Sequence, residues 1–245
     1  MLLLLTVAAG SMDSISYLGL GNVFTAMMTG NIVFLGLTAG QGEFLAPSRG
    51  FVALIGFCIG VITGAAIVER KPRDSEWPIS VTWALAAEAL LLLIFVLLWD
   101  FCGGERSGVL KYTLILISAL AMGIQSAAVG YLGVPGITTT YITGTLTALM
   151  ISVRHRLGWR KYKKNHSPGK IPATLGSPPP TSHMFSLAAV VFFYGVGAFI
   201  GSVLHGSGST IVESGFPTLA VFLVVINSAL LHYLEYRDLK RPSSP

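Results

Sequence analysis

Asp13 is the residue whose chemistry fits its surroundings least, because it lies midway along the apolar segment 2–20. A carboxylate at membrane depth is costly to bury, and such residues commonly bind ions, carry protons or contact substrates. Asp13 therefore has three candidate roles: it binds a cation, carries a proton, or bonds the N-terminus of a helix in the facing half of the chain. The alternative is a structural carboxyl group that accepts hydrogen bonds from Thr side chains or backbone amides.

Two segments rich in Thr, Gly and Asn carry the other candidate groups, FTAMMTGNIVFLGL at 24–37 and TTTYITGTLTALM at 138–150. Polar groups without partners cost several kcal/mol in lipid, so these segments should lie against protein or water. In the functional hypothesis they line a central site, and their glycines permit a break in the helix. In the alternative, the hydroxyl groups bond to their own helices and the glycines only pack. The candidate solute- or ion-binding residues are Asp13, Thr29, Gly30, Asn31, Gln125, Thr139, Thr143 and Gly144.

Glu88 is a second acidic residue within an apolar segment, 79–99. It is a candidate for proton binding, and the alternative is local pairing or a position near the membrane interface.

Three signatures of soluble enzymes, H-E-x-x-H, G-x-x-x-x-G-K and G-x-S-x-G, do not occur in the sequence. The two cysteines, Cys58 and Cys102, show no zinc spacing or disulfide framework. We therefore expect no enzymatic activity, no metal and no cofactor.

The composition indicates that lipid is the solvent for most of the chain. Of its 245 residues, 53% are hydrophobic and 11% are charged, and the mean hydropathy is +0.71. A soluble domain carries about 25% charged residues, so this chain has too few charges to cover a surface in water. The net charge of +5 does not indicate nucleic-acid binding, because many basic residues lie together in the segment 154–183, beside apolar helices.

A membrane helix needs about 20 mostly apolar residues. Six segments meet or approach this length: 2–20, 51–68, 79–99, 110–132, 184–205 and 216–236. The first has no charged n-region and no cleavage site, so we interpret it as a membrane helix rather than a signal peptide. Two more segments, 22–40 and 135–153, are long enough but unusually rich in Thr, Gly and Asn. We expect an all-α polytopic membrane protein in which these two are broken or re-entrant helices.

The chain also resembles itself along its length. The motif at 10–13, GSMD, is followed by Tyr-Leu-Gly at 17–19 and Thr-Gly at 29–30. The motif at 123–126, GIQS, is followed by the same residues at 131–133 and 143–144. The offset is 113 residues at the first glycine and 114 from the tyrosine onward, so Asp13 corresponds to Ser126. Such repeats are common in secondary transporters, where the substrate site lies between the halves.

The repeat continues into two small-residue motifs, Gly60-x-x-x-Gly64 and Gly197-x-x-x-Gly201. Small residues let membrane helices meet closely, so we assign these glycines to helix packing, and whether they also form a homo-oligomer stays open. The sequence thus predicts a single membrane domain over 1–245. Its parts are a first repeat at 1–99, a second at 100–236 that contains the basic, proline-containing loop 154–183, and a polar tail at 237–245.

Two topologies are compatible with this repeat. If each half crosses the membrane three times, the halves are inverted; if each crosses four times, they are parallel. Both place the same number of Lys and Arg residues inside. The compact cluster Arg70, Lys71 and Arg73 would be outside only in the second topology, so the positive-inside rule favours the first. Both topologies place the long basic loop and the C-terminus in the cytoplasm.

Two stretches carry a resemblance to a known family. The runs GSMDSISYLGLGNVFTAMMTGNIVFLGL at 10–37 and AMGIQSAAVGYLGVPGITTTYITGTLTAL at 121–149 resemble the conserved stretches of the YoaK-like family, a membrane family carried as domain of unknown function 1275. The resemblance implies a multi-pass protein with about six spans and supplies no substrate. The insert before Met184 is longer than in the compact bacterial form, which indicates a fungal-type member.

These observations favour a transporter or channel for a small solute or ion, with its site between the two repeats. Asp13 would be the coupling or cation-binding group, and the Thr and Asn side chains would bind the solute. The rival class is a non-transporting scaffold or assembly factor, in which the Thr- and Gly-rich segments pack without a cavity. An intramembrane enzyme would need Asp13 or Glu88 to meet a nucleophile or a second acid.

Overall fold

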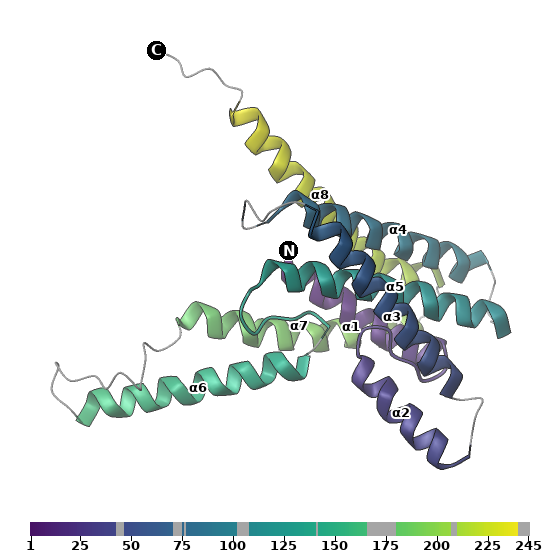
Figure 1. Ribbon diagram of the computed structural model, residues 1–245, viewed down its shortest axis with the longest axis horizontal. Helices are drawn as coiled ribbons and strands as arrows, with labels where there is room; N and C mark the ends of the chain where they lie inside the picture. Colours follow the sequence, from purple (N-terminus) through teal and green to yellow (C-terminus); the bar gives the residue numbers. More distant parts are fainter. Residues whose placement is uncertain are drawn as a thin grey trace.

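A computed structural model of the protein describes residues 1–42, 47–70, 75, 77–101, 108–140, 142–165, 180–206 and 210–239 (Figure 1). These residues form eight α-helices and no strand. The helices are α1 (Leu2–Gly19), α2 (Met28–Gly40), α3 (Pro47–Val68), α4 (Ile79–Phe101), α5 (Gly108–Leu132), α6 (Ile142–Asn165), α7 (Thr181–Gly206) and α8 (Thr210–Leu239). Cys102, the proline run at 178–179 and the tail from 240 lie outside the described residues.

Six of these helices are long and apolar enough to cross a membrane: α1, α3, α4, α5, α7 and α8. A helix satisfies its own backbone hydrogen bonds, which is why it is stable in lipid. The other two helices differ, because α2 has 13 residues and α6 continues into the basic run RHRLGWRKYKKN. The expected helical membrane protein with about six spans is confirmed. Re-entrant insertion of α2 and α6 stays a prediction.

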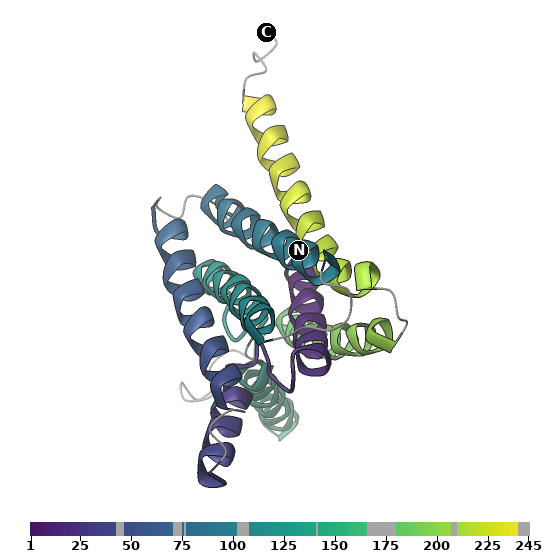
Figure 2. The same cartoon turned by 90° about the vertical axis from the view of Figure 1, so that its right-hand side faces the viewer.

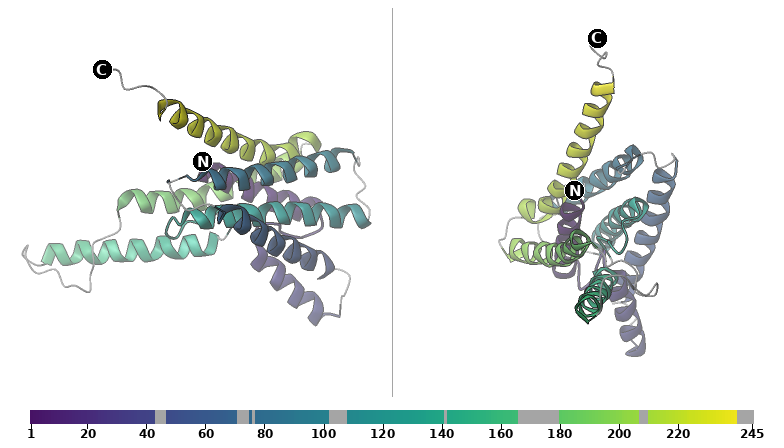
Figure 3. Two further views of the ribbon diagram at one scale, coloured as in Figure 1. Left: turned by 45° about the horizontal axis from the view of Figure 1, so that its top comes forward. Right: turned by 90° about the vertical axis from the view of Figure 1, so that its left-hand side faces the viewer.

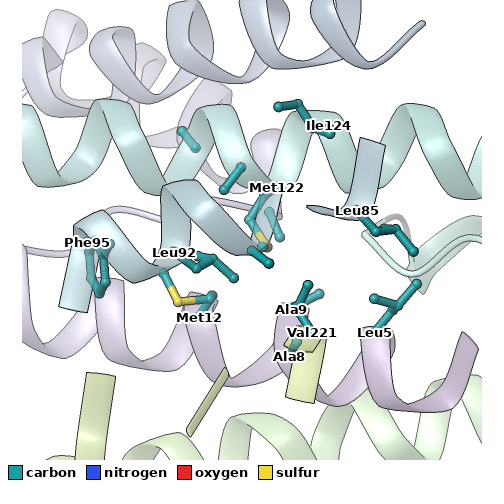
Figure 4. Packing of buried hydrophobic residues seen from close by; sticks show 14 of the residues in the cluster. Leu5, Ala8, Ala9, Met12, Leu85, Leu92, Phe95, Met122, Ile124 and Val221 are labelled. Atoms are coloured by element: carbon teal, nitrogen blue, oxygen red, sulfur yellow. The ribbon is translucent and has the colours of Figure 1, made fainter. Parts of the chain in front are cut away.

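The helices form layers around two central elements. Seen end-on, α3, α5, α1 and α7 lie side by side in that order (Figures 2 and 3). Helices α4 and α8 cover one side of this row, and α2 and α6 lie on the opposite side, against α3 and α7. Since α1 and α5 have neighbours on several sides, they are the most deeply buried helices. Their apolar side chains pack with those of α4 and α8, as Met12, Leu92, Phe95 and Met122 show in Figure 4.

The two halves make corresponding contacts. Helix α2 packs on α3 as α6 packs on α7, and α3 packs on α5 as α7 packs on α1. Helix α4 also contacts α5 as α8 contacts α1, and α4 and α8 contact each other. Helix α3 of the first half therefore packs on α5 of the second half, and α7 of the second half packs on α1 of the first. These contacts interlock the two halves.

Glycines set the distance between these interlocked helices. A Cβ at Gly60 would overlap the carbonyl oxygen of Leu120 in α5, and one at Gly64 would lie 2.9 Å from the Cβ of Ala127. On the other side, a Cβ at Gly197 would overlap the carbonyl oxygen of Val7, and one at Gly201 would lie 2.8 Å from that of Ser11. All four glycines of the small-residue motifs thus lie in contacts within one chain.

Among the helix ends that differ from the sequence expectation, two lie in segments that were expected not to be helical. The segment 154–183 was expected to be a loop, but α6 continues through its first part to Asn165, and α7 begins at Thr181. Lys, Arg and Leu favour helix, so the basic run extends α6 although it is too polar for the membrane core. The tail was expected from 237, but α8 continues to Leu239.

The glycine contacts lead to a prediction about α7. Gly197→Val places side-chain carbons against the backbone of α1, whereas Gly195→Val meets open space two residues away. Overpacking of this kind costs about 1–3 kcal/mol. We expect Gly197→Val to lower the midpoint of thermal unfolding in detergent clearly, and Gly195→Val to leave it near wild type. Equal midpoints for the two variants would show that α1 and α7 are not in close contact.

Candidate functional site

The chain reverses direction after α1 so that the start of α2 meets Asp13. Helix α1 ends at Gly19, and Gly21 and Asn22 follow with φ of 91° and 59°, a left-handed turn that glycine and asparagine tolerate. Arg49 of α3 donates to the carbonyl oxygen of Gly21 at 3.3 Å and holds this turn in place. The chain then runs back along α1 without helical structure until α2 begins at Met28.

The Asp13 carboxylate accepts hydrogen bonds from three consecutive backbone amides in this returning stretch. The amides of Thr25 and Ala26 donate to Oδ1 at 2.8 and 2.7 Å, and the amide of Met27 donates to Oδ2 at 3.0 Å. These amides lie at the N-cap of α2 or just before it, where no helical hydrogen bond pairs them, and the helix dipole favours a negative charge near the start of α2. Asp13, which is 3% exposed, therefore supplies acceptors that lipid cannot supply.

A fourth donor reaches Asp13 from the second half of the chain. The hydroxyl group of Tyr194 in α7 donates to Oδ2 of Asp13. The carboxylate thus joins α1, the start of α2 and α7. Both of its oxygens have partners, as expected for the structural carboxyl group. The helix N-terminus that it bonds belongs to its own half rather than to the facing half.

The corresponding position of the second half has no carboxylate. Ser126 accepts a hydrogen bond from the Thr140 hydroxyl group at 3.0 Å. The neighbouring Gln125 side chain donates to the Thr139 hydroxyl group at 2.9 Å and to the carbonyl oxygen of Leu5 in α1 at 3.0 Å. Hydroxyl and amide groups thus hold the stretch before α6, where a carboxylate holds the stretch before α2.

Another pair of hydrogen bonds recurs at the offset of 114 residues. The Asn31 side chain accepts from the amide of Phe24 at 3.0 Å and donates to its carbonyl oxygen at 2.6 Å. The Thr145 hydroxyl group likewise accepts from the amide of Thr138 at 3.3 Å and donates to its carbonyl oxygen at 3.4 Å. In both halves, a polar side chain in the first turns of the helix ties down the residue seven positions earlier.

A cavity of about 230 Å³ lies where the starts of α2 and α6 approach each other. Its lining comes from both halves, at positions that correspond: Ala26 with Thr140, Met28 with Ile142, and Thr29 with Thr143. Met27, Phe57, Ser126 and Tyr194 complete the lining. Thr29 and Thr143 are exposed, so the cavity is not sealed.

Comparison with known proteins identifies the family. Residues 1–228 match the family described as "Protein of unknown function (DUF1275)". The chain belongs to the DUF1275 family. It is also similar to the UPF0700 transmembrane protein YoaK of Bacillus subtilis (strain 168), with 43% identity over 164 residues, which are 67% of this chain and 71% of YoaK. No solved structure matches the chain. The YoaK-like resemblance is confirmed, and the fungal-type assignment stays a prediction.

The structure of this DUF1275 protein divides the predicted binding residues into three groups. Thr29 and Thr143 line the cavity. Asp13, Asn31, Gln125 and Thr139 are not among the lining residues. Asp13 and Asn31 bond to the backbone before α2, and Gln125 donates to Thr139 and to the carbonyl oxygen of Leu5. Gly30 and Gly144 follow the two lining threonines within α2 and α6 and are not part of the lining.

Several lining residues were not predicted from the sequence. Met27, Met28 and Ile142 are apolar and gave no chemical signal. Phe57 and Tyr194 had a signal, because each stands three residues before the first glycine of its small-residue motif. An alignment of the two small-residue motifs pairs Phe57 with Tyr194, so the repeat places an aromatic side chain at this position in both halves.

The three amide donors at Asp13 lead to a stability prediction for this DUF1275 protein. Asp13→Ala leaves the amides and the Tyr194 hydroxyl group without their acceptor at membrane depth. Hydrogen bonds to charged groups contribute about 1.5–3 kcal/mol each, so unfolding in detergent should become easier by about 3 kcal/mol or more. The matched change Ser126→Ala removes one neutral hydrogen bond and should cost about 1 kcal/mol. Losses of similar size in the two variants would contradict this role of Asp13.

Proposed function

We propose that this DUF1275 protein moves a small polar solute across the membrane through the cavity between its two halves. The observation that carries the proposal is the lining of the cavity, which both halves supply from corresponding positions at the starts of α2 and α6. Secondary transporters use such sites, in which discontinuous helices of two repeats point their N-termini at the substrate. No enzymatic step and no cofactor are part of the proposal.

The order of the spans supports inverted halves. Successive spans cross a membrane in alternating directions, and α1 and α5 are the first and fourth of the six candidates. They would therefore cross in opposite directions, as would α3 and α7, and α4 and α8. In this arrangement α2 and α6 enter from opposite sides and start near mid-membrane. By the positive-inside rule, the basic end of α6, Arg70 and the C-terminus lie in the cytoplasm.

Rocking of the halves about this site would alternate its exposure. Helices α3 and α7 each pack on the first helix of the other half, so movement of one half carries a cavity wall with it. The bond from Tyr194 to Asp13 also crosses between the halves, beside the cavity. Asp13 thus has a positioning role in the proposal, in place of direct solute binding.

The lining defines the class of solute. The cavity, about 230 Å³, is smaller than the roughly 300–1,000 Å³ of pockets for drug-sized ligands. Hydroxyl groups of Ser126, Thr140 and Tyr194 lie beside apolar side chains, and no charged side chain is among the lining residues described. A neutral solute with a few hydrogen-bonding groups fits this lining better than an ion does.

One donor in the cavity wall favours a solute with an acceptor oxygen. Thr140 corresponds to Ala26, whose amide donates to Asp13. Within the described part of the chain, the amide of Thr140 has no such acceptor, because Ser126 stands where the first half has the carboxylate. An oxygen atom of a bound solute would accept a hydrogen bond from this amide.

The rival scaffold function predicts that the Thr- and Gly-rich segments pack without a cavity. Cysteine labelling tests this difference in a variant whose Cys58 and Cys102 are changed to Ser. We expect Thr143→Cys to react with a small charged methanethiosulfonate reagent, because water reaches the cavity. Ile62→Cys should stay unreactive, although Ile62 is 69% exposed in the structure, because lipid covers α3 there. Protection of both positions would favour the scaffold.

Uptake measurements test transport itself. Comparison of metabolites between deletion and wild-type cells first identifies the candidate solute, and uptake is then measured in vesicles. Thr143→Trp should fill the cavity and reduce uptake at least tenfold. A tenfold reduction corresponds to a loss of about 1.4 kcal/mol in the free energy of solute binding. The control Phe199→Trp changes a 70% exposed side chain of α7 and should leave uptake unchanged. Full uptake by Thr143→Trp would place the path elsewhere.

A further inference from the structure

Glu88 is fully buried, and its carboxyl group has no hydrogen-bond partner among the described residues. Its side chain is 0% exposed in α4. Neither carboxyl oxygen has a hydrogen-bond partner among the described residues. The residues one turn away on the same side of α4, Leu85 and Leu92, are also fully buried, and Figure 4 shows both pointing into the apolar core. Asp13, by contrast, has four donors, so Asp13 and Glu88 have different environments.

Glu88 lies in the stretch of α4 that two hydrogen bonds join to α8, a helix of the other half. Thr82 of α4 and Ser228 of α8 share a hydrogen bond between their hydroxyl groups. Ten residues along α4, the Thr218 hydroxyl group of α8 donates to the carbonyl oxygen of Leu92 at 3.4 Å. Glu88 lies between these two bonds. The bonds themselves correspond at an offset of 136 residues, which pairs Glu88 with Val224, an apolar residue that is equally buried.

No charged group in the described residues offsets a charge on Glu88. Helices α3, α5 and α8 pack on α4. Apart from Cys58, which is exposed, their described titratable side chains lie towards the helix ends: Arg49, Lys111, Tyr112, Tyr131, Glu213, His232, Tyr233 and Arg237. An ionised carboxylate with neither a charge partner nor a hydrogen bond is among the costliest groups to bury. A neutral carboxyl group, which carries its proton, is far less costly there.

We propose that Glu88 is a proton-binding site that exchanges its proton with water when the contact between α4 and α8 opens. In the structure described, the carboxyl group holds the proton among apolar side chains. When the two halves separate at α4 and α8, water enters, the O–H bond breaks, and the proton passes to water while the carboxylate stays on Glu88. Return to the closed arrangement requires the proton to be bound again. This inference rests on the proposed transport function: the site couples movement of the solute to movement of protons.

The experiment uses dicyclohexylcarbodiimide, an apolar reagent, on the full chain in liposomes. The protonated carboxyl group adds across a C=N bond of the reagent, its proton goes to the nitrogen, and the adduct rearranges to a stable N-acylurea that mass spectrometry detects. We expect Glu88 to be labelled, with a rate that falls about tenfold per pH unit once the carboxyl group is mostly ionised. Asp13 should stay unlabelled, because four donors hold its oxygens.

Three controls make the result specific. Glu88→Gln should abolish the label and retain the wild-type unfolding midpoint. A water-soluble carbodiimide should label Glu88 at least tenfold more slowly than the apolar one. The swap Glu88→Val with Val224→Glu should move the label to position 224, since the two positions correspond across the contact between α4 and α8. Absence of label at Glu88 at every pH, or a rate independent of pH, would overturn the proton site.

The outcomes separate this inference from the proposed function. A pH-dependent label on Glu88 without uptake of any candidate solute would support the proton site and contradict transport. Uptake that a pH gradient does not drive, together with an unlabelled Glu88, would support transport and contradict the proton site. With both proposals correct, Glu88→Gln should lose accumulation driven by the pH gradient at least tenfold and keep exchange of labelled for unlabelled solute.

Discussion

The pairing of the Asp13 carboxylate with the amides of Thr25, Ala26 and Met27 is the interaction on which the site depends. Backbone amides at membrane depth need acceptors, and the non-helical stretch that leads into α2 has no helical hydrogen bonds to supply them. Because Asp13 supplies them, the chain can turn back along α1 and start α2 beside the centre of the bundle. The hydroxyl group of Tyr194 ties the same carboxylate to α7 of the other half.

The difference between the two halves is as informative as their likeness. Asn31 and Thr145 perform the same task at corresponding positions, as do the glycines at the contacts of α3 with α5 and of α7 with α1. Asp13 and Ser126, however, differ in charge, and so do Glu88 and Val224. Both acids belong to the first half. At these corresponding positions of the proposed transporter, the first half therefore carries the acids, whereas the second half carries Val224 and the neutral hydroxyl group of Ser126.

The sequence predicted the parts of this arrangement that depend on local composition. Apolar length predicted the six candidate spans, and the polar residues within lipid pointed to Asp13 and to the segments around Thr29 and Thr143. The roles were harder to assign, because they depend on contacts between residues far apart in sequence. Asn31 and Gln125 were expected to bind a solute, but their hydrogen bonds go to backbone and to Thr139. Tyr194, 181 residues from Asp13, could be placed beside it only by the packing of α7 on α1.

The central claim is that the two halves insert in opposite directions, so that α6, like α2, starts inside the membrane and does not cross it. The most direct measurement is the side on which single cysteines at Gln41, Arg70 and Arg237 react with a membrane-impermeant maleimide, in a variant without native cysteines. Inverted halves predict that Arg70→Cys and Arg237→Cys are protected in intact cells and react in inverted vesicles, while Gln41→Cys reacts in intact cells. Reaction of Arg70→Cys and Arg237→Cys from opposite sides would show that α6 spans the membrane, because an odd number of spans would then separate them, and would contradict the account.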